Sequence, residues 1–410
     1  MKIGIVTYSL SAGGGVSTFV LSLGRYLSSL GHEVVVITEQ SQGAWYPEIA
    51  RSGLKGDYRN VGIREWLPFG KLIYAHKMGM LLREGRYDAI LLNHCLFSQL
   101  SAHLYNRSTV VVSVIHNNNR GVYMVGGRNV GNIDAVACVS AATQQGARRY
   151  IDPQKLHCIP NGIELPETTT DSSASNQFPP LKIIFVGRLN HEQKGIFFIP
   201  EILKQCREKA AFPIEMTIIG DGPEKNQLIE RLKEKEVEDL VTFKGIIPRE
   251  AVYKQYMTHH IFLMPSFYEG LPLTLIESMS CGCVPIASHL EKITDYCVEA
   301  GVDGFLPPVG ATDSFADAII TLGNNSDLRQ TMSRLCREKA ARNFSIQRMG
   351  NDYLTLINEL QEKRAKKIYI PEGYKLRNIH WKDFFPESMI IGVKRSIERF
   401  KRSSDKKNNL

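Results

Sequence analysis

Residues 261–277 read IFLMPSFYEGLPLTLIE, and this stretch indicates the fold more clearly than any other part of the chain. Its first four residues are apolar and predict a short buried strand, whereas the residues from Pro272 onward have the spacing of a helix. Another apolar run, 284–287, follows that helix. A strand, a loop, a helix and a second strand are typical of a parallel βαβ unit.

The rest of the chain repeats this alternation in two parts. In the first part we predict strands at 3–7, 33–38, 89–92, 109–115, 135–139 and 156–159, and a helix at 16–30. In the second part we predict strands at 182–186, 215–219, 241–243, 261–264 and 284–287, and helices at 195–209, 223–236, 249–257, 272–281, 312–323 and 326–342. Continuous apolar runs separated by helices indicate α/β domains whose parallel sheets are covered on both faces.

A segment rich in Thr, Ser and Pro, residues 164–180 (ELPETTTDSSASNQFPP), predicts a linker between these parts. We therefore expect an N-terminal Rossmann-like domain at 1–163, closed by a C-terminal helix at about 346–365, and a second at 181–345. Doubly wound sheets bind ligands at the carboxyl ends of their strands, so we expect the site in the central cleft that the two domains face.

Composition excludes several classes of protein. The chain has 410 residues, of which 43% are hydrophobic and 22% charged, as in a folded globular protein. It has no apolar run of the roughly 18–20 residues that span a bilayer, and its first strand leads into a glycine loop rather than a signal cleavage site.

Its eight cysteines lack a C-x-x-C pair, so we expect buried, reduced thiols in a cytosolic protein and no metal site.

Two cations and several glycines follow predicted strands. Gly187 and Arg188 end the strand 182–186, and Lys194 comes six residues after Arg188 at the expected start of the next helix. Arg can bind two oxygens of a diphosphate while Lys acts as a point charge, although both could be solvated loop charges. The stretch 219–224 (IGDGPE), with Gly220 and Gly222, predicts a strand end and a turn.

The first glycine loop is SAGGG at 11–15. Gly14 and Gly15 would let the backbone approach an anion at a helix N-terminus, or would simply form a tight turn. The loop is not a G-x-G-x-x-G motif, and we expect no ribose-binding acid at the end of the second strand.

Two glutamates belong to the opening stretch. Glu269 lies in the loop, and Glu277 lies within the apolar helix, where a carboxylate is costly to bury unless a salt bridge or sugar hydroxyls satisfy it. The backbone N–H groups around residues 270–273 would face an incoming phosphate.

Together these motifs resemble the family 4 retaining GT-B glycosyltransferases. The resemblance rests on Gly-Arg-Leu…Lys-Gly, Gly-Asp-Gly-Pro-Glu, Glu-x7-Glu and residues 159–163 (IPNGI), and it covers about residues 1–362. It implies a nucleotide-sugar donor, UDP- or GDP-linked, that is bound mainly by the second domain, and an acceptor that is bound mainly by the first. No cofactor and no metal are implied. The alternatives are another GT-B chemistry, such as an epimerase or a phosphorylase, or a non-catalytic binding protein.

Carried over to this sequence, the resemblance implies a role for each matching residue. Arg188 and Lys194 would bind the donor diphosphate, Glu269 the donor sugar and Glu277 the ribose hydroxyls. His116, after the strand 109–115, would lie beside the transferred sugar. The remaining implied donor contacts are Gly14, Gly15, Gly187, Gly220, Gly222, Ser266, Gly270, Leu271 and Leu273. The sequence departs from the family at His116, which is followed by Asn instead of Asp, and in the first glycine loop, where many relatives carry a glutamate.

The excess positive charge lies in the C-terminal tail. Residues 1–362 hold 36 Lys and Arg against 37 Asp and Glu, whereas residues 363–410 hold 14 against 5. Within the tail, 366–410, Ile390, Val393, Ile397 and Phe400 share one face of a predicted helix, and basic residues take the other positions. A basic amphipathic segment at 381–402 indicates binding to an anionic membrane surface rather than to nucleic acid. The alternative is a terminal helix that docks on the folded protein.

These expectations combine into one functional prediction. A membrane-associated transferase at the inner face of the plasma membrane would suit a saccharide or lipid-linked acceptor. That describes polysaccharide or glycolipid biosynthesis, as in capsule or lipopolysaccharide O-antigen assembly.

Overall fold

The computed structural model describes residues 1–8, 10, 15–39, 53–58, 70–93, 95–166 and 180–366. The chain folds into two compact units. Unit 1 comprises Met1–Cys138, Gly146–His157 and the chain from Tyr353 onward, and unit 2 comprises Val139–Gln145 and Cys158–Asp352. Three predictions lie outside the described residues: the tail helix at 381–402, the position of Gly14 and most of the linker.

Unit 1 contains a seven-stranded sheet in the order β3-β2-β1-β4-β5-β6-β7. Its strands are β1 (Lys2–Thr7), β2 (Glu33–Thr38), β3 (Lys55–Tyr58), β4 (Ala89–Asn93), β5 (Val110–Ile115), β6 (Ala135–Cys138) and β7 (Leu156–Cys158). The pairings from β3 through β6 are parallel, with Ile5 opposite Val36 on one side and Leu91 on the other. Every residue of β4 and β5 is buried, as the continuous apolar runs predict.

The helices of unit 1 follow its strands. They are α1 (Gly15–Ser29), α3 (Gly70–Glu84), α4 (Leu96–Leu100) and α5 (Arg120–Gly126), with α6 (Ala141–Ala147) shared between the units. Side chains of α3, α4 and α5 form one core with alternate strand residues such as Ile90 and Leu92. The intervening strand residues are buried as well, so the sheet is covered on both faces.

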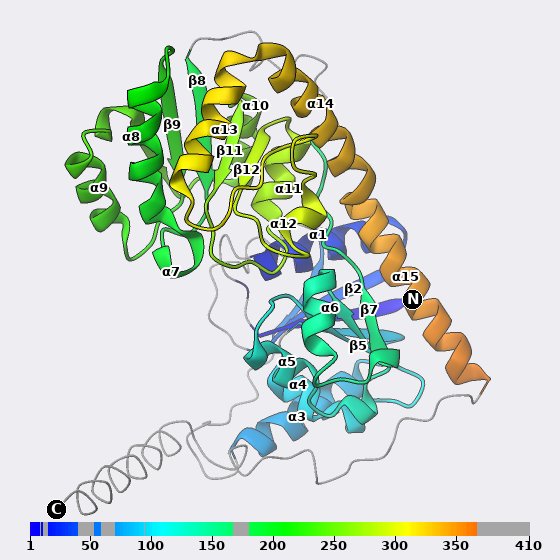
Figure 1. Cartoon of the computed structure of the whole chain (residues 1–410). Helices are drawn as coiled ribbons and strands as arrows, with labels where there is room; N and C mark the ends of the chain where they lie inside the picture. The colour runs from blue at the N-terminus through cyan, green and yellow to red at the C-terminus, as the bar shows by residue number, and fades with distance from the viewer. Residues whose placement is uncertain are drawn as a thin grey trace, which may run out of the picture. The chain divides into compact units, whose positions relative to one another are not determined.

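Unit 2 contains a five-stranded parallel sheet in the order β10-β9-β8-β11-β12 (Figure 1). Its strands are β8 (Leu181–Val186), β9 (Ile214–Ile219), β10 (Val241–Gly245), β11 (Ile261–Met264) and β12 (Val284–Ala287). The chain runs from β8 to β9 on one side and later to β11 on the other. The carboxyl ends of β8 and β11 therefore lie at the switch point of the sheet, where doubly wound folds bind ligands.

The helices of unit 2 are α7 (His191–Lys194), α8 (Ile199–Lys209), α9 (Lys225–Glu234), α10 (Arg249–Met257), α11 (Leu273–Ser280), α12 (Thr294–Cys297), α13 (Thr312–Asn324) and α14 (Ser326–Asn343). Residues of α8, α9 and α13 pack into one core with the sheet. The last described helix, α15 (Ile346–Ala365), begins in unit 2 and ends in unit 1. In unit 1, Arg364 of α15 forms an ion pair with the buried Asp134 at 2.6 Å.

The α/β class and the two doubly wound parallel sheets are confirmed, but two local predictions are wrong. The predicted helix 195–209 begins four residues late: α7 ends at Lys194, Gly195 has φ 63°, Ile196–Phe198 form a 3-10 turn, and the long helix α8 begins at Ile199. Lys194 therefore ends a short helix instead of starting a long one, because the left-handed Gly195 terminates α7. Likewise α9 begins at Lys225, two residues after Pro223.

The eight cysteines all lie in described residues and are free. Seven of them are buried as predicted, whereas Cys158 is exposed at the end of β7. Across the part of the chain that the structure describes, no His, Cys, Asp and Glu side chains group as a metal site would require. The helices described here include none that combines the length and apolar character of a membrane span.

Candidate active site

Glycines in unit 2 bring the loops after β8, β9 and β11 into backbone contact. A Cβ added to Gly220, which has φ 131°, would lie 1.9 Å from the carbonyl oxygen of Gly187. A Cβ at Gly195 would lie equally close to the carbonyl oxygen of Pro265, and one at Gly222 would lie 2.3 Å from a backbone oxygen. Contacts this short exclude any side chain, so these turns need glycine to bring the three loops together.

The loops after β8 and β11 are joined by an ion pair. The ammonium of Lys194 lies 2.7 Å from Oε1 of Glu269, which also accepts a hydrogen bond from the Ser266 hydroxyl at 2.8 Å. The Gln193 amide donates to the other carboxylate oxygen at 3.4 Å. Only 16% of the Lys194 side chain and 6% of the Glu269 side chain are exposed. The structure thus brings together three of the residues that the sequence assigned to one site.

Arg188 is the second predicted cation. It follows Gly187 at the end of β8, is exposed, and forms no ion pair with any residue in the described ranges. A Cβ added to Gly187 would lie 3.6 Å from Cε of Lys194, so both basic residues adjoin this glycine. The arrangement offers one neutralised cation and one uncompensated cation at the same turn.

Helix α11 begins beside Glu269. Its first residue is Leu273, and Leu275 is the first residue whose N–H closes a turn, by donating to the carbonyl of Pro272 at 3.1 Å. Within the described part of the chain, the N–H groups of Gly270, Leu271 and Leu273 have no acceptor. These free donors and the positive end of the helix dipole favour an anion at this position.

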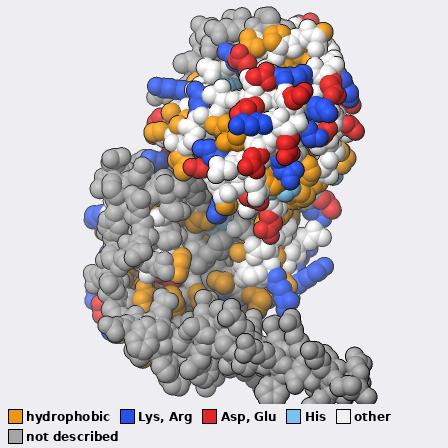
Figure 2. Space-filling view, turned by 90° about the vertical axis from the view of Figure 1, so that its left-hand side faces the viewer, with side chains coloured by type: hydrophobic (Ala, Val, Ile, Leu, Met, Phe, Trp, Pro, Cys, Tyr) orange, Lys and Arg blue, Asp and Glu red, His pale blue; other side chains and the backbone are white. Residues whose placement is uncertain are grey.

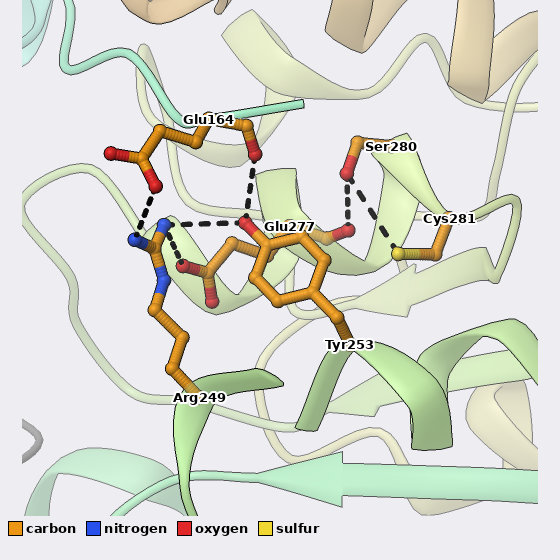
Figure 3. Close-up of polar contacts among 6 residues, drawn as sticks. All are labelled: Glu164, Arg249, Tyr253, Glu277, Ser280 and Cys281. Carbon is orange, nitrogen blue, oxygen red and sulfur yellow. Dashed lines mark hydrogen bonds and ion pairs between the residues drawn. The ribbon is translucent and has the colours of Figure 1, made fainter. Parts of the chain in front are cut away.

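Glu277 lies in the second turn of α11 and is 7% exposed. Its Oε1 accepts a hydrogen bond from Nη2 of Arg249 at 3.2 Å, so the salt bridge that the sequence left open is present (Figure 3). Burial raises the pKa of the Glu277 carboxyl, and Arg249 opposes that rise. Sequence reasoning missed Arg249 because its partner lies 28 residues further along the chain, in another helix.

In unit 1, the predicted residue His116 lies just after β5 and is buried. Its Nε2 is 2.8 Å from Oδ1 of Asn93, whose amide nitrogen donates to the carbonyl of Val6 at 3.0 Å. The Asn93 oxygen is thus the group that faces the imidazole, which places a proton on Nε2. The imidazole also packs against the ring of Phe19 in α1, at 4.7 Å between ring centroids. Sequence reasoning did not predict Asn93 as a partner of the histidine.

An acidic residue does follow β2, although we assigned it no role with a ribose. Glu39 directly follows the strand and is buried. Its Oε1 accepts hydrogen bonds from the backbone N–H of Ser98 at 2.7 Å and from the Ser98 hydroxyl at 2.6 Å. The carboxylate therefore caps helix α4. Gly15 is the first residue of α1, and the rest of the predicted glycine loop, residues 11–14, lies outside the described residues.

The charges on the exposed face of unit 2 are mixed. Figure 2 shows Lys and Arg side chains interspersed with Asp and Glu, without a large patch of one sign on that face of the unit. This agrees with the near-zero net charge of residues 1–362.

Two family models match the chain side by side. "Glycosyltransferase Family 4" matches residues 13–167, and "Glycosyl transferases group 1" matches residues 169–339. Among curated relatives, an Escherichia coli UDP-Gal:alpha-D-GlcNAc-diphosphoundecaprenol alpha-1,3-galactosyltransferase is 29% identical over 48% of this chain and 52% of its own length. A Bacillus anthracis N-acetyl-alpha-D-glucosaminyl L-malate synthase is 22% identical over 90% of this chain and 100% of its own.

Other relatives match in part. One component of the Arabidopsis thaliana phosphatidylinositol N-acetylglucosaminyltransferase is 25% identical over 69% of this chain and 66% of its own length. The chain thus spans 66% of the length of this relative and 52% of the length of the E. coli relative.

Solved structures share the fold over most of the chain. Anabaena HepE in complex with UDP and glucose superposes with a TM-score of 0.72 at 17% identity, over 88% of this chain and 100% of its own. A glycosyltransferase from Rickettsia africae gives 0.71 at 17% identity, over 88% and 98%. The two doubly wound sheets therefore define a GT-B fold. With both family models matched in sequence, the chain belongs to family 4 of the glycosyltransferases.

Proposed function

We propose that this protein transfers a sugar from a nucleoside-diphosphate donor, UDP- or GDP-linked, to a saccharide or lipid-linked acceptor, with retained anomeric configuration. The observation that carries the proposal is the Lys194–Glu269 ion pair at the switch point of unit 2, next to the exposed Arg188 and the start of α11. The E. coli relative is named for a UDP-Gal donor, and HepE was solved in complex with UDP and glucose, which supports the donor class.

The proposed reaction breaks the bond between the anomeric carbon and the donor diphosphate and forms a bond from that carbon to an acceptor hydroxyl oxygen, whose proton passes to the departing diphosphate. Negative charge then develops on the diphosphate, where Arg188 and the N–H groups at the start of α11 would stabilise it. The Lys194 ammonium has three protons and directs one of them to Glu269, which leaves two for phosphate oxygens. The residues need no resident cofactor or metal for this step.

The remaining residues have proposed binding roles. Glu269 would accept hydrogen bonds from hydroxyls of the donor sugar, and Glu277 from those of the ribose. His116 would contact the transferred sugar on the acceptor side. Retention would follow from attack on the face from which the diphosphate leaves, without a covalent enzyme intermediate.

The acceptor and the place of action extend the proposal. The E. coli relative is named for a diphosphoundecaprenol-linked acceptor, which supports a lipid-linked saccharide and hence synthesis of a capsule, a lipopolysaccharide or a glycolipid. The basic amphipathic segment 381–402, which lies outside the described residues, would hold the enzyme at the inner face of the plasma membrane.

Thermal unfolding in the presence of a panel of UDP-, GDP- and ADP-sugars tests the donor class. We expect stabilisation by one nucleotide family, because a ligand that binds only the folded state raises the unfolding midpoint. If no nucleotide or nucleotide sugar raises the midpoint, the proposal fails. The stabilising donor is then incubated with lipid-linked saccharides, and NMR of the product reads the anomeric configuration. Release of an altered sugar without a coupled product would favour an epimerase instead.

A further inference from the structure

Arg249 in unit 2 lies between two carboxylates that come from distant parts of the sequence. It is the first residue of α10, and its Nη2 donates to Oε1 of Glu277 at 3.2 Å. Its Nη1 donates to Oε2 of Glu164 at 3.4 Å, from the segment that precedes β8 (Figure 3). The side chain is 28% exposed, against 42% for Glu164 and 10% for Glu277. The more buried of the two carboxylates is therefore the one in the candidate donor site.

Tyr253 fixes the guanidinium from a further direction. It lies one helical turn after Arg249, which donates to the phenolic oxygen at 3.3 Å. The phenol in turn donates to the backbone carbonyl of Glu164 at 3.2 Å. The guanidinium carbon lies 5.4 Å from the centre of the Tyr253 ring. Because these contacts fix both ends of the guanidinium fork, Arg249 presents a fixed charge and a fixed donor to Glu277.

A ribose diol requires a particular state of Glu277. The ionised carboxylate acts purely as an acceptor through both oxygens, whereas protonation turns one oxygen into an O–H donor and weakens it as an acceptor, and burial favours the protonated form. Each oxygen has two lone pairs, so the bond from Arg249 to Oε1 leaves acceptor capacity on both.

We propose that Arg249 is a positioning residue of the donor site, which keeps Glu277 ionised and oriented so that it can accept hydrogen bonds from the two ribose hydroxyls. This inference rests on the proposed function, because it assigns the nucleotide to Glu277. It adds a residue that does not touch the nucleotide and that the sequence motifs did not identify.

The groups around Glu277 have opposing effects on its protonation. The ionisable groups that face it are Arg249, Tyr253 and Tyr256 from α10, Cys281 after α11, and Glu164. Arg249 lowers the pKa of Glu277 by charge and by hydrogen bonding, whereas the negative charge of Glu164 raises it. Removing either charge should therefore shift the pH dependence of nucleotide binding, but in opposite directions.

The full chain is titrated with UDP, GDP and ADP in parallel by calorimetry, between pH about 5 and about 8. For Arg249→Gln we expect binding weakened by about tenfold or more at neutral pH, because each unit by which the pKa of Glu277 rises above the ambient pH reduces the ionised fraction tenfold. Affinity should recover as the pH rises. For Glu164→Gln we expect the acid limb of binding to move to lower pH, and Arg249→Lys should recover part of the lost affinity.

The outcomes separate the two proposals. If the wild type binds a nucleotide and Arg249→Gln follows the same pH profile, the positioning role is overturned while the proposed function stands. Shifts of the same sign in Arg249→Gln and Glu164→Gln also overturn it, since general damage to the structure would produce that pattern. If the wild type binds no nucleotide, the proposed function fails and this inference fails with it. Unfolding midpoints without nucleotide show whether each variant folds; should Arg249→Gln not fold, an unshifted Glu164→Gln profile overturns the role.

Discussion

Lys194 and Glu269 are separated by 75 residues in sequence, yet the ammonium of one lies 2.7 Å from the carboxylate of the other. The contact joins the loops after β8 and β11, and neither side chain is substantially exposed. Arg188, at the same turn, is exposed and has no such partner among the described residues. The two cations are therefore expected to respond differently to mutation.

Arg188→Ala should reduce the rate of transfer by about 10²–10³ without changing stability, because the variant removes a stabilising donor from the departing diphosphate and no contact from the fold. Lys194→Ala should reduce the rate similarly, but it should also destabilise the protein, since it leaves the buried Glu269 carboxylate uncompensated. Initial rates and unfolding midpoints are measured on the same preparations.

Lys204→Ala is the matched control for these variants. Lys204 forms an exposed ion pair with Glu208 within α8, at 3.8 Å, and we expect no change in rate and little in stability. An Arg188→Ala enzyme with wild-type kcat and KM would remove Arg188 from the proposed mechanism.

Gly220→Ala should both unfold more easily and bind nucleotide less tightly. Its positive φ alone costs on the order of 1–3 kcal/mol for a residue with a side chain. The new Cβ would in addition press on the carbonyl of Gly187, so the turn that carries Arg188 has to move. Denaturant unfolding and nucleotide titration measure the two effects.

Gly301→Ala separates the cost of a positive φ from the displacement of a neighbouring turn. Gly301 has φ 80°, but an added Cβ there meets no atom within 4 Å. This variant should lose stability through φ alone and keep its nucleotide affinity. Equal losses of affinity in both variants would contradict the role given to the Gly220 contact.

The sequence predicts most of the fold because the inner strands of both sheets, such as β4, β5 and β11, are buried along their whole length and read as apolar runs. Strand β3 (KGDY) escaped prediction because an edge strand pairs on one side only and can be polar. Motif spacing identified Lys194 and Glu269 separately. It could not show that they meet, nor that Arg249 holds Glu277, because these contacts depend on how distant loops and helices pack.

The buried side chain of His259 lets us predict how the stability of the protein depends on pH. Its Nδ1 donates to the carbonyl of Gln255 at 2.6 Å and its Nε2 accepts from the Thr217 hydroxyl at 2.9 Å, so the buried ring is held neutral. Burial lowers the pKa of His259 from 6.5 to about 4. The unfolded chain therefore binds a proton first as the pH falls, and the folded state should lose about 3 kcal/mol between these two values.

His259→Gln tests this assignment by comparison with the wild type. The variant should be less stable at neutral pH, and the difference in unfolding free energy between the two proteins should shrink as the pH falls from 6.5 toward 4. Other titrating groups contribute equally to both proteins and cancel in the difference. A difference that does not change with pH would refute the neutral, buried state of His259.

Deleting residues 381–410 should release the protein from anionic vesicles and leave its nucleotide affinity unchanged. The deletion removes the predicted basic amphipathic segment but retains α15 with its Arg364–Asp134 ion pair. Each basic residue near an anionic surface contributes about 1 kcal/mol, so the predicted helix, with Lys394, Arg395, Arg399, Lys401 and Arg402, could account for several kcal/mol of attraction. Co-sedimentation with phosphatidylserine vesicles measures binding, with neutral phosphatidylcholine vesicles and high salt as controls, since salt screens this attraction. Sedimentation of the truncated protein at the wild-type level would exclude the segment as the membrane contact, and its docking on the folded units would be the remaining role.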